Sequence, residues 1–344
     1  MAALTGDSVA SPLVWGITLV LLIGLLAVDL LVIARQPHEP TMREVSRHLI
    51  FFVGLAVLFG IGLAIFAEPH ELSPHPATEF FAGWLTEYSL SVDNLFIFIV
   101  IMANFNVPRR FQQTALMIGI VLALIFRAVF IVIGAAAINE FSWVFYLFGL
   151  FLVWTAVKLA REGGDDDDEY EENRLVQWAE SHLPATKEWH STSITHKVTV
   201  DGVTKRLLTP MFFVILTLGT TDLLFALDSI PAIYGLTKDP YIVFTANLFA
   251  LMGLRQLYFL IGGLLKRLIY LSYGLAFLLG FIGVKLILHA LHENELPFIN
   301  GGHHVGWAPD IPIWLSLVVI VGTLVVTTVL SLWASRRESS RSPE

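Results

Sequence analysis

Runs of about twenty apolar residues recur along the whole chain, and they constrain its fold more than any other feature. An α-helix rises about 1.5 Å per residue, so a run of about twenty residues matches the hydrocarbon core of a bilayer. The sequence therefore predicts an all-α polytopic membrane protein with about nine transmembrane helices. They are expected at residues 12–34, 48–67, 80–104, 114–137, 142–160, 208–233, 242–265, 269–290 and 311–333.

Composition supports this interpretation and excludes several other classes of protein. Only 15% of the 344 residues are charged, whereas soluble domains carry about 25%. The chain has no cysteine, which excludes a disulfide framework, a thiolate metal site and a thiol redox centre within it. A net charge of −8 argues against binding to nucleic acid, which needs a basic surface. Residues 1–11 lack the basic segment of a secretory signal, so the first apolar run is expected to be retained as a helix.

Basic residues are distributed unevenly between the loops, and this predicts how the helices are oriented. The loops after the first, third, fifth, seventh and ninth runs hold sixteen of the 21 Lys and Arg residues, and the opposite loops hold only Lys238. By the positive-inside rule, the N-terminus is outside and the C-terminus is cytoplasmic. We therefore expect a multi-pass protein of the cell membrane with an odd number of crossings, a condition that seven helices would also meet.

Two stretches, SLSVDNLFIFIV at 89–100 and LLFALDSIPAIY at 223–234, resemble each other. Each places an aspartate in an apolar run, with a small polar residue directly after it and a second carboxylate six residues before it. These residues are Glu87, Asp93 and Asn94 in the first stretch, and Asp222, Asp228 and Ser229 in the second. Farther along, an arginine followed by a glycine, and then a tyrosine followed by a lysine, also recur at equal spacings. The basic residues are Arg127 and Lys158 in the first copy, and Arg255 and Lys285 in the second.

This repetition predicts two copies of a three-helix unit, at residues 80–160 and 208–290. The third helix is expected to run from outside to inside and the sixth from inside to outside, so the copies are inverted. Inverted repeats are the architecture of alternating-access transporters, whose binding site lies near the middle of the membrane.

Three segments lie outside the repeats. Residues 1–79 are expected to form two helices, and residues 291–344 an outer loop, the last helix and a cytoplasmic tail. Residues 161–207 form a cytoplasmic linker that contains GGDDDDEYEEN and HKVTVDGVTKRLL. We interpret the acidic run as a solvated connection, and the alternation around Asp201 and Gly202 predicts a small hairpin.

Ionisable residues inside a membrane cost about 2.5–3.5 kcal/mol each on insertion scales, so they need partners or a function. Two carboxylates six residues apart on one helix point about 120° away from each other and cannot chelate one ion together. We instead expect Asp93 and Asp228 to meet across the repeat axis. Pro231 leaves the Leu227 carbonyl without its helical partner, which adds one oxygen. Such an oxygen-rich site suits Mg²⁺, Ca²⁺ or Mn²⁺. The candidate ligands are Asp93, Asp228, Glu87, Asp222, Asn94, Ser229 and Asn247.

Buried ion pairs that only hold helices together are the alternative explanation of these charges. We favour that explanation for Asp29, Lys158 and Lys285, because each lies near a helix end where a long side chain reaches water easily. Arg127 and Arg255 fit either explanation equally, since they could also neutralise an empty cation site and release it when a cation arrives.

At these residues the sequence resembles the TerC family of integral membrane proteins. The resemblance rests on EYSLSVDNLFIF, on the stretch from TDLLFALDSIPAIY to LRQLYFL, and on YGLAFLLGFIGVKLILH, and it extends over residues 12–334. It implies a role in metal-ion homeostasis, with Mn²⁺ export as the expected activity and the acidic residues of the two motifs as ligands. Many members carry a glutamate three residues before Asp222, where this chain has Gly219, so the choice of cation or the coupling is expected to differ.

The sequence therefore predicts a secondary transporter rather than an enzyme. It would export a divalent cation, first of all Mn²⁺, by alternating access, and proton exchange on the same carboxylates is one way to couple the transport. Mn²⁺ would be its substrate, with no permanently bound cofactor, and the bilayer its surroundings. Two alternatives stay open, namely a membrane assembly or metal-loading scaffold without transport, and an exporter of small solutes.

Overall fold

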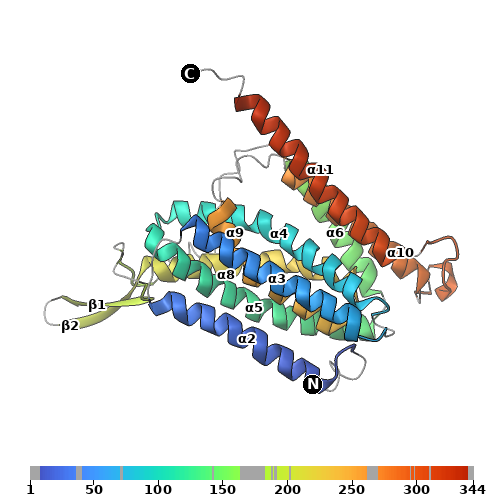
Figure 1. Cartoon of the computed structure of the whole chain (residues 1–344), viewed down its shortest axis with the longest axis horizontal. Helices are drawn as coiled ribbons and strands as arrows, with labels where there is room; N and C mark the ends of the chain where they lie inside the picture. The colour runs from blue at the N-terminus through green and yellow to red at the C-terminus, as the bar shows by residue number, and fades with distance from the viewer. Residues whose placement is uncertain are drawn as a thin grey trace.

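The computed structural model describes residues 8–35, 41–69, 73–141, 143–162, 183–186, 189, 192–200, 203–261, 270–294, 296–297, 299–309 and 311–339. Nine α-helices lie within these residues, and each coincides with one of the predicted apolar runs (Figure 1). They are α2 (Pro12–Arg35), α3 (Met42–Phe66), α4 (Pro76–Asn104), α5 (Arg109–Glu140), α6 (Val144–Glu162), α8 (Pro210–Tyr234), α9 (Pro240–Ile261), α10 (Leu271–His292) and α11 (Ile313–Ser339).

Eight of these helices, all except α4, are long and apolar enough to cross a membrane by length and composition within the described residues. α4 is 29 residues long and carries Glu79, Glu87 and Asp93. The predicted class, an all-α polytopic membrane protein, is therefore confirmed.

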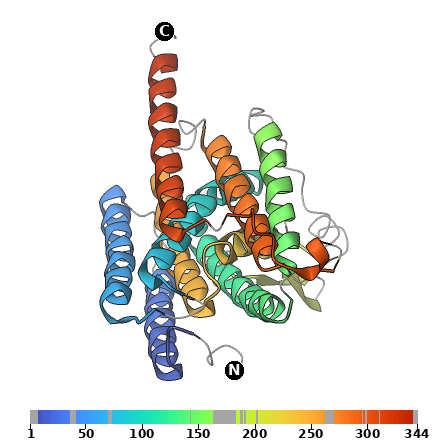
Figure 2. The same ribbon diagram turned by 90° about the vertical axis from the view of Figure 1, so that its right-hand side faces the viewer.

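Four helices form the centre of the bundle. α4 packs against α8 and α9, and α5 packs against the same two helices. α9 has 89% of its apolar span buried, whereas α2 and α11 each have 11% buried and lie at the periphery. α3 covers α4 and α9, while α6 packs along α10, and α11 lies over α10 and α4 (Figure 2).

Glycines let α6 and α10 approach each other closely. A Cβ atom on Gly283 would lie 2.8 Å from the carbonyl oxygen of Gly149, and one on Gly149 would lie 2.7 Å from the carbonyl oxygen of Gly283. Small residues permit this kind of backbone contact between membrane helices. The two backbones therefore touch at this point.

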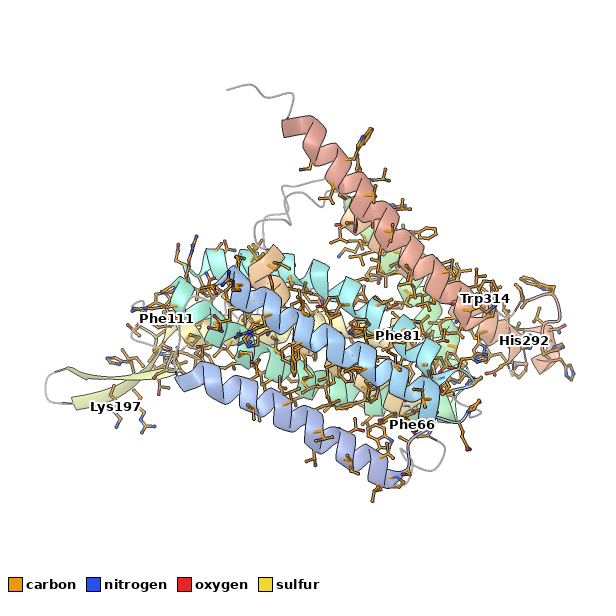
Figure 3. All side chains as sticks on the ribbon, in the orientation of Figure 1. Phe66, Phe81, Phe111, Lys197, His292 and Trp314 are labelled. Atoms are coloured by element: carbon orange, nitrogen blue, oxygen red, sulfur yellow. The ribbon has the colours of Figure 1, made fainter. Side chains whose placement is uncertain are left out.

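The two ends of the bundle carry different structures. The predicted hairpin is confirmed, because β1 (Thr195–Val200) pairs antiparallel with β2 (Val203–Leu208), although Asp201 and Gly202 lie outside the described residues, as does the acidic run. The opposite end holds the short 3-10 helix η2 (Asn300–Gly302). Figure 3 shows Lys197 of the hairpin at one end of the molecule, and His292 and Trp314 at the other.

Candidate functional site

A cluster of charged side chains is buried where α4, α5, α8 and α9 meet. Its centre is Arg127 of α5, which is 1% exposed. The guanidinium donates to Glu87 of α4 and, at 2.9 Å, to the amide oxygen of Asn247 of α9. Its Nε donates to Asp222 Oδ2 of α8 at 3.5 Å. One arginine thus connects three helices and two carboxylates, and it keeps its positive charge in any protein environment.

Helical periodicity and one local hydrogen bond explain this geometry. Ala123, Arg127 and Ile131 are all buried, and their spacing of four residues places them on one face of α5. Asn247 donates its amide nitrogen to the Val243 carbonyl at 3.0 Å, one turn earlier in α9. That bond fixes the amide, so its oxygen remains to accept from Arg127.

Several buried oxygen atoms near the cluster have no hydrogen-bond partner among the described residues. They are Glu87 Oε1, Ser91 Oγ and Ser229 Oγ, and the Ser229 hydroxyl faces the Glu87 carboxylate. A buried polar atom without a partner costs about 1–3 kcal/mol. Such atoms beside an ion pair indicate a position where a water molecule or a cation can bind.

Asp228 belongs to the same cluster, whereas the position of the Asp93 carboxylate stays a prediction. Asp228 is half-buried on α8 and interacts electrostatically with Arg127 and Glu87. The backbones of Asp93 and Asn94 lie in α4, and Asn94 is buried, but the side chain of Asp93 lies outside the described residues. Among the described side chains, no three His, Asp or Glu residues gather closely enough to hold a metal ion by themselves.

Two of the other three basic residues of the repeats donate hydrogen bonds to residues outside the predicted ligand set. Arg255 donates to Asp29 of α2 at 3.0 Å, which gives Asp29 the ion pair expected of it. Lys285 of α10 donates to Ser316 of α11 at 3.1 Å. Lys158 is exposed near the end of α6. Arg127 joins carboxylates from both sequence motifs.

A second group of buried carboxylates was not predicted from the sequence. Asp239 is fully buried, and it accepts hydrogen bonds from Ser8 Oγ at 2.9 Å and from the backbone nitrogens of Val9 and Tyr241. Glu79 is also buried and accepts from Thr237 Oγ1 and the His75 nitrogen. Because the oxygens of both are hydrogen-bonded, we interpret them as anchors for the N-terminal segment and the α8–α9 turn. An Asp directly before the Pro of a new helix was the available signal.

Comparison with known proteins identifies the family. The model of the integral membrane protein TerC family matches residues 72–339. The chain belongs to the TerC family. The matched residues begin just before α4 and include every residue of the Arg127 cluster. The helices α2, which carries Asp29, and α3 lie before the matched residues.

Similar proteins extend over nearly the whole length of this TerC protein. The uncharacterized membrane protein Rv2723 of Mycobacterium tuberculosis is 47% identical over 330 residues, which is 95% of this chain and 81% of that one. The putative membrane-bound redox modulator Alx of Escherichia coli strain K12 is 34% identical over 339 residues, 97% of this chain and 99% of that one. The uncharacterized membrane protein STKORF319 of Myxococcus xanthus is 36% identical over 332 residues, 96% of each chain. No solved structure matches this TerC protein.

Proposed function

We propose that this TerC protein is a secondary transporter that exports a divalent cation, first of all Mn²⁺, from the cytoplasm by alternating access. The observation that carries the proposal is the contact of Arg127 with Glu87 and Asp222, deep among the helices of a polytopic membrane protein. Charges in a membrane interior are functional by default, and two carboxylates around one arginine have the form of a cation site held closed by a counter-ion.

The charges of the cluster permit exchange between the arginine and a metal ion. Two ionised carboxylates and one guanidinium leave a net charge of −1, so the cluster attracts cations even when Arg127 is bound. A divalent ion that displaced the guanidinium would gain the Glu87 and Asp222 oxygens, and it would also find the unpartnered Ser229 hydroxyl. All of these are oxygen ligands, which suit Mn²⁺, Mg²⁺ and Ca²⁺ better than softer metals. Asp228 and the predicted position of Asp93 would complete the site.

The order of helix contacts supports the inverted repeat on which alternating access rests. If α4 corresponds to α8, and α5 to α9, then the contact of α4 with α9 becomes the contact of α8 with α5, and both contacts exist. The contacts of α6 with α10, α4 with α8 and α5 with α9 each map onto themselves. This is the pattern that a twofold axis between the units would produce. The repeat itself stays a prediction, as does the orientation in the cell membrane.

Transport of Mn²⁺ into proteoliposomes tests the proposal. We expect wild-type protein to move Mn²⁺, and Asp93→Asn and Asp228→Asn each to reduce the flux to that of empty liposomes. Glu79→Gln is the matched control, because Glu79 is another buried carboxylate on α4 with its own hydrogen bonds and no contact with Arg127. Ca²⁺, Mg²⁺ and Zn²⁺ as competitors would rank the ions. Equal flux from all four proteins would refute the site.

A second class of function follows from the name of one relative. Alx is called a putative membrane-bound redox modulator, and a scaffold or redox factor without transport would need neither Asp93 nor Asp228. Because this chain has no cysteine, any redox effect would have to act through another molecule, such as a metal ion whose concentration it controls. Retention of the cellular phenotype in both aspartate variants, together with absence of flux in wild type, would favour this second class.

A further inference from the structure

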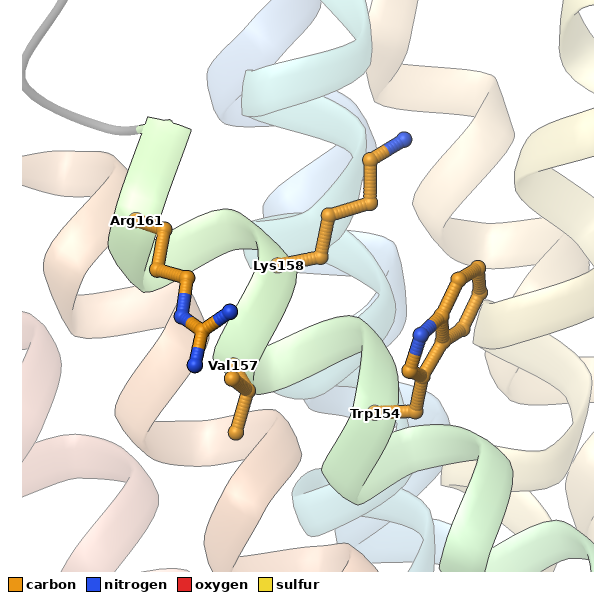
Figure 4. A pocket seen from close by; sticks show the side chains of 4 residues that line it. All are labelled: Trp154, Val157, Lys158 and Arg161. Atoms are coloured by element: carbon orange, nitrogen blue, oxygen red, sulfur yellow. The ribbon is translucent and has the colours of Figure 1, made fainter.

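A cavity of about 240 Å³ opens on the surface of α6, and none of the residues of the Arg127 cluster lines it. Among the described residues, four side chains line it, all from the last part of the helix (Figure 4). They are Trp154, Val157, Lys158 and Arg161. The spacing of three, four and seven residues places them on one face of the helix, whereas Gly149, Leu152 and Ala156, on another face, are buried.

The side chains of the cavity are ordered along the helix axis by polarity. Trp154 and Val157 come first and are 61% and 44% exposed. Lys158 and Arg161 follow, and both are exposed at the end of α6, which closes at Glu162. In the predicted orientation this end of α6 faces the cytoplasm, so the apolar pair lies at the level of lipid tails and the basic pair at the level of phosphates. Tryptophan is enriched at this boundary.

We propose that this cavity binds the headgroup of an anionic phospholipid from the inner leaflet, with the phosphate held by Lys158 and Arg161. Charge complementarity supports this occupant, because the inner leaflet is negatively charged and basic pockets beside membrane helices select such headgroups. Arginine offers paired N–H donors to phosphate oxygens, and lysine adds a second point charge. The indole of Trp154 and the side chain of Val157 contact the glycerol and the first acyl carbons.

A basic pair elsewhere on the same predicted side provides the matched control. Arg109 and Arg110 begin α5 and are exposed, and the Arg110 guanidinium lies 4.6 Å from the centre of the Phe111 ring. They do not line the α6 cavity. General attraction between a basic helix end and an anionic membrane would depend equally on both pairs, whereas a headgroup site depends on the α6 pair alone.

The test measures phosphatidylglycerol bound to the full-length protein in phosphatidylcholine nanodiscs, by native mass spectrometry at increasing phosphatidylglycerol content. Each basic residue near a membrane surface contributes about fivefold to such binding, so Lys158→Gln with Arg161→Gln should weaken it about thirtyfold. Arg109→Gln with Arg110→Gln should leave it within about twofold of wild type. The exchanged pair, Lys158→Arg with Arg161→Lys, keeps both positive charges and should retain binding. This control shows whether the Gln variants lose binding because the charges are gone or because substitution at these positions disturbs the fold.

Three results would overturn the proposal. The first is an equal loss in the two double Gln variants, which would reduce the effect to general surface attraction. The second is displacement of phosphatidylglycerol by inorganic phosphate, which would make the cavity a simple anion site. The third concerns the acidic run, whose aspartates at 165–168 follow α6 directly in the sequence. If wild type binds no phosphatidylglycerol but a variant with these four aspartates changed to asparagine does, the acidic run is the occupant instead.

Discussion

Removal of Arg127 should destabilise the protein more than removal of any other basic side chain of the repeats. Arg127→Met keeps most of the side-chain volume but deletes the donors to Glu87, Asp222 and Asn247. Both carboxylates then remain buried at about 1% exposure without a counter-charge. Removing one partner of a buried ion pair costs about 3–5 kcal/mol, mainly because the other charge is left without compensation.

The two carboxylates should couple to Arg127 with different strengths. The contact with Glu87 is the closer of the two, whereas Asp222 Oδ2 accepts from Nε over 3.5 Å, which makes this the longer and weaker hydrogen bond. In a double-mutant cycle we expect about 2–3 kcal/mol of coupling between Arg127→Met and Glu87→Gln, near the upper end for contacting residues. The cycle with Asp222→Asn should give about 1 kcal/mol.

Reversible unfolding in mixed micelles, driven by increasing amounts of a denaturing detergent, would measure these free energies. The double variant Glu87→Gln with Arg127→Met should be more stable than the sum of its single variants predicts, because one of the two uncompensated charges is gone. Additive effects would mean that the two side chains do not interact in the membrane. A stronger coupling to Asp222 than to Glu87 would contradict the arrangement of the cluster.

Two further predictions concern the packing of α10 and the charge of Glu293, which follows α10. Gly283→Ala should lower the free energy of unfolding by about 1–3 kcal/mol in the same assay, since its Cβ would lie 2.8 Å from the backbone of Gly149. Gly280→Ala is the control and should be nearly neutral, because its Cβ would lie 3.5 Å from that of Ala156. Equal losses in the two variants would contradict the close backbone contact. At the C-terminal end of α10, His289, which lies 3.2 Å from Glu293, and then Lys238 lower the pKa of Glu293 to about 2, below its ordinary value of about 4.3. Glu293→Gln should therefore lower the melting temperature at neutral pH. The difference in melting temperature between the variant and wild type should shrink as the pH falls from about 4 towards 2. A difference that stays constant over that range would show that the carboxylate charge is not the cause.

The sequence predicted the number and positions of the helices because the thickness of the hydrocarbon core determines the length of each apolar run. It placed the ends of some helices less well. α3 begins at Met42 rather than at residue 48, because its polar first turns extend the helix into water, where Thr41 caps it by accepting from the Glu44 nitrogen. α5 likewise begins at Arg109 rather than at residue 114. A hydropathy pattern detects only the apolar part of a helix.

The sequence singled out members of the Arg127 cluster, but it did not predict how they pair. The matched spacing of the two motifs singled out Glu87 and Asp222. Because a charge buried in a membrane is unfavourable without a partner, both were expected to pair. Arg127 and Arg255 occupy equivalent positions in the sequence, so the sequence does not indicate which of them pairs with these carboxylates. The difference comes from the distance between helices, and a single sequence carries no record of which helices are neighbours.

That difference has a consequence for the charge of the site. If Arg255 also faced the motif carboxylates, two guanidinium groups would balance Glu87 and Asp222 fully, and a divalent cation would have to enter against net repulsion. Asp29, on a helix outside the predicted repeat, holds Arg255 at 3.0 Å instead. The cluster around Arg127 therefore keeps one uncompensated negative charge, and Asp228 adds to it when ionised. If the cluster is the proposed cation site, the ion pair between Arg255 and Asp29 of α2 keeps the second arginine of the predicted repeat from neutralising it.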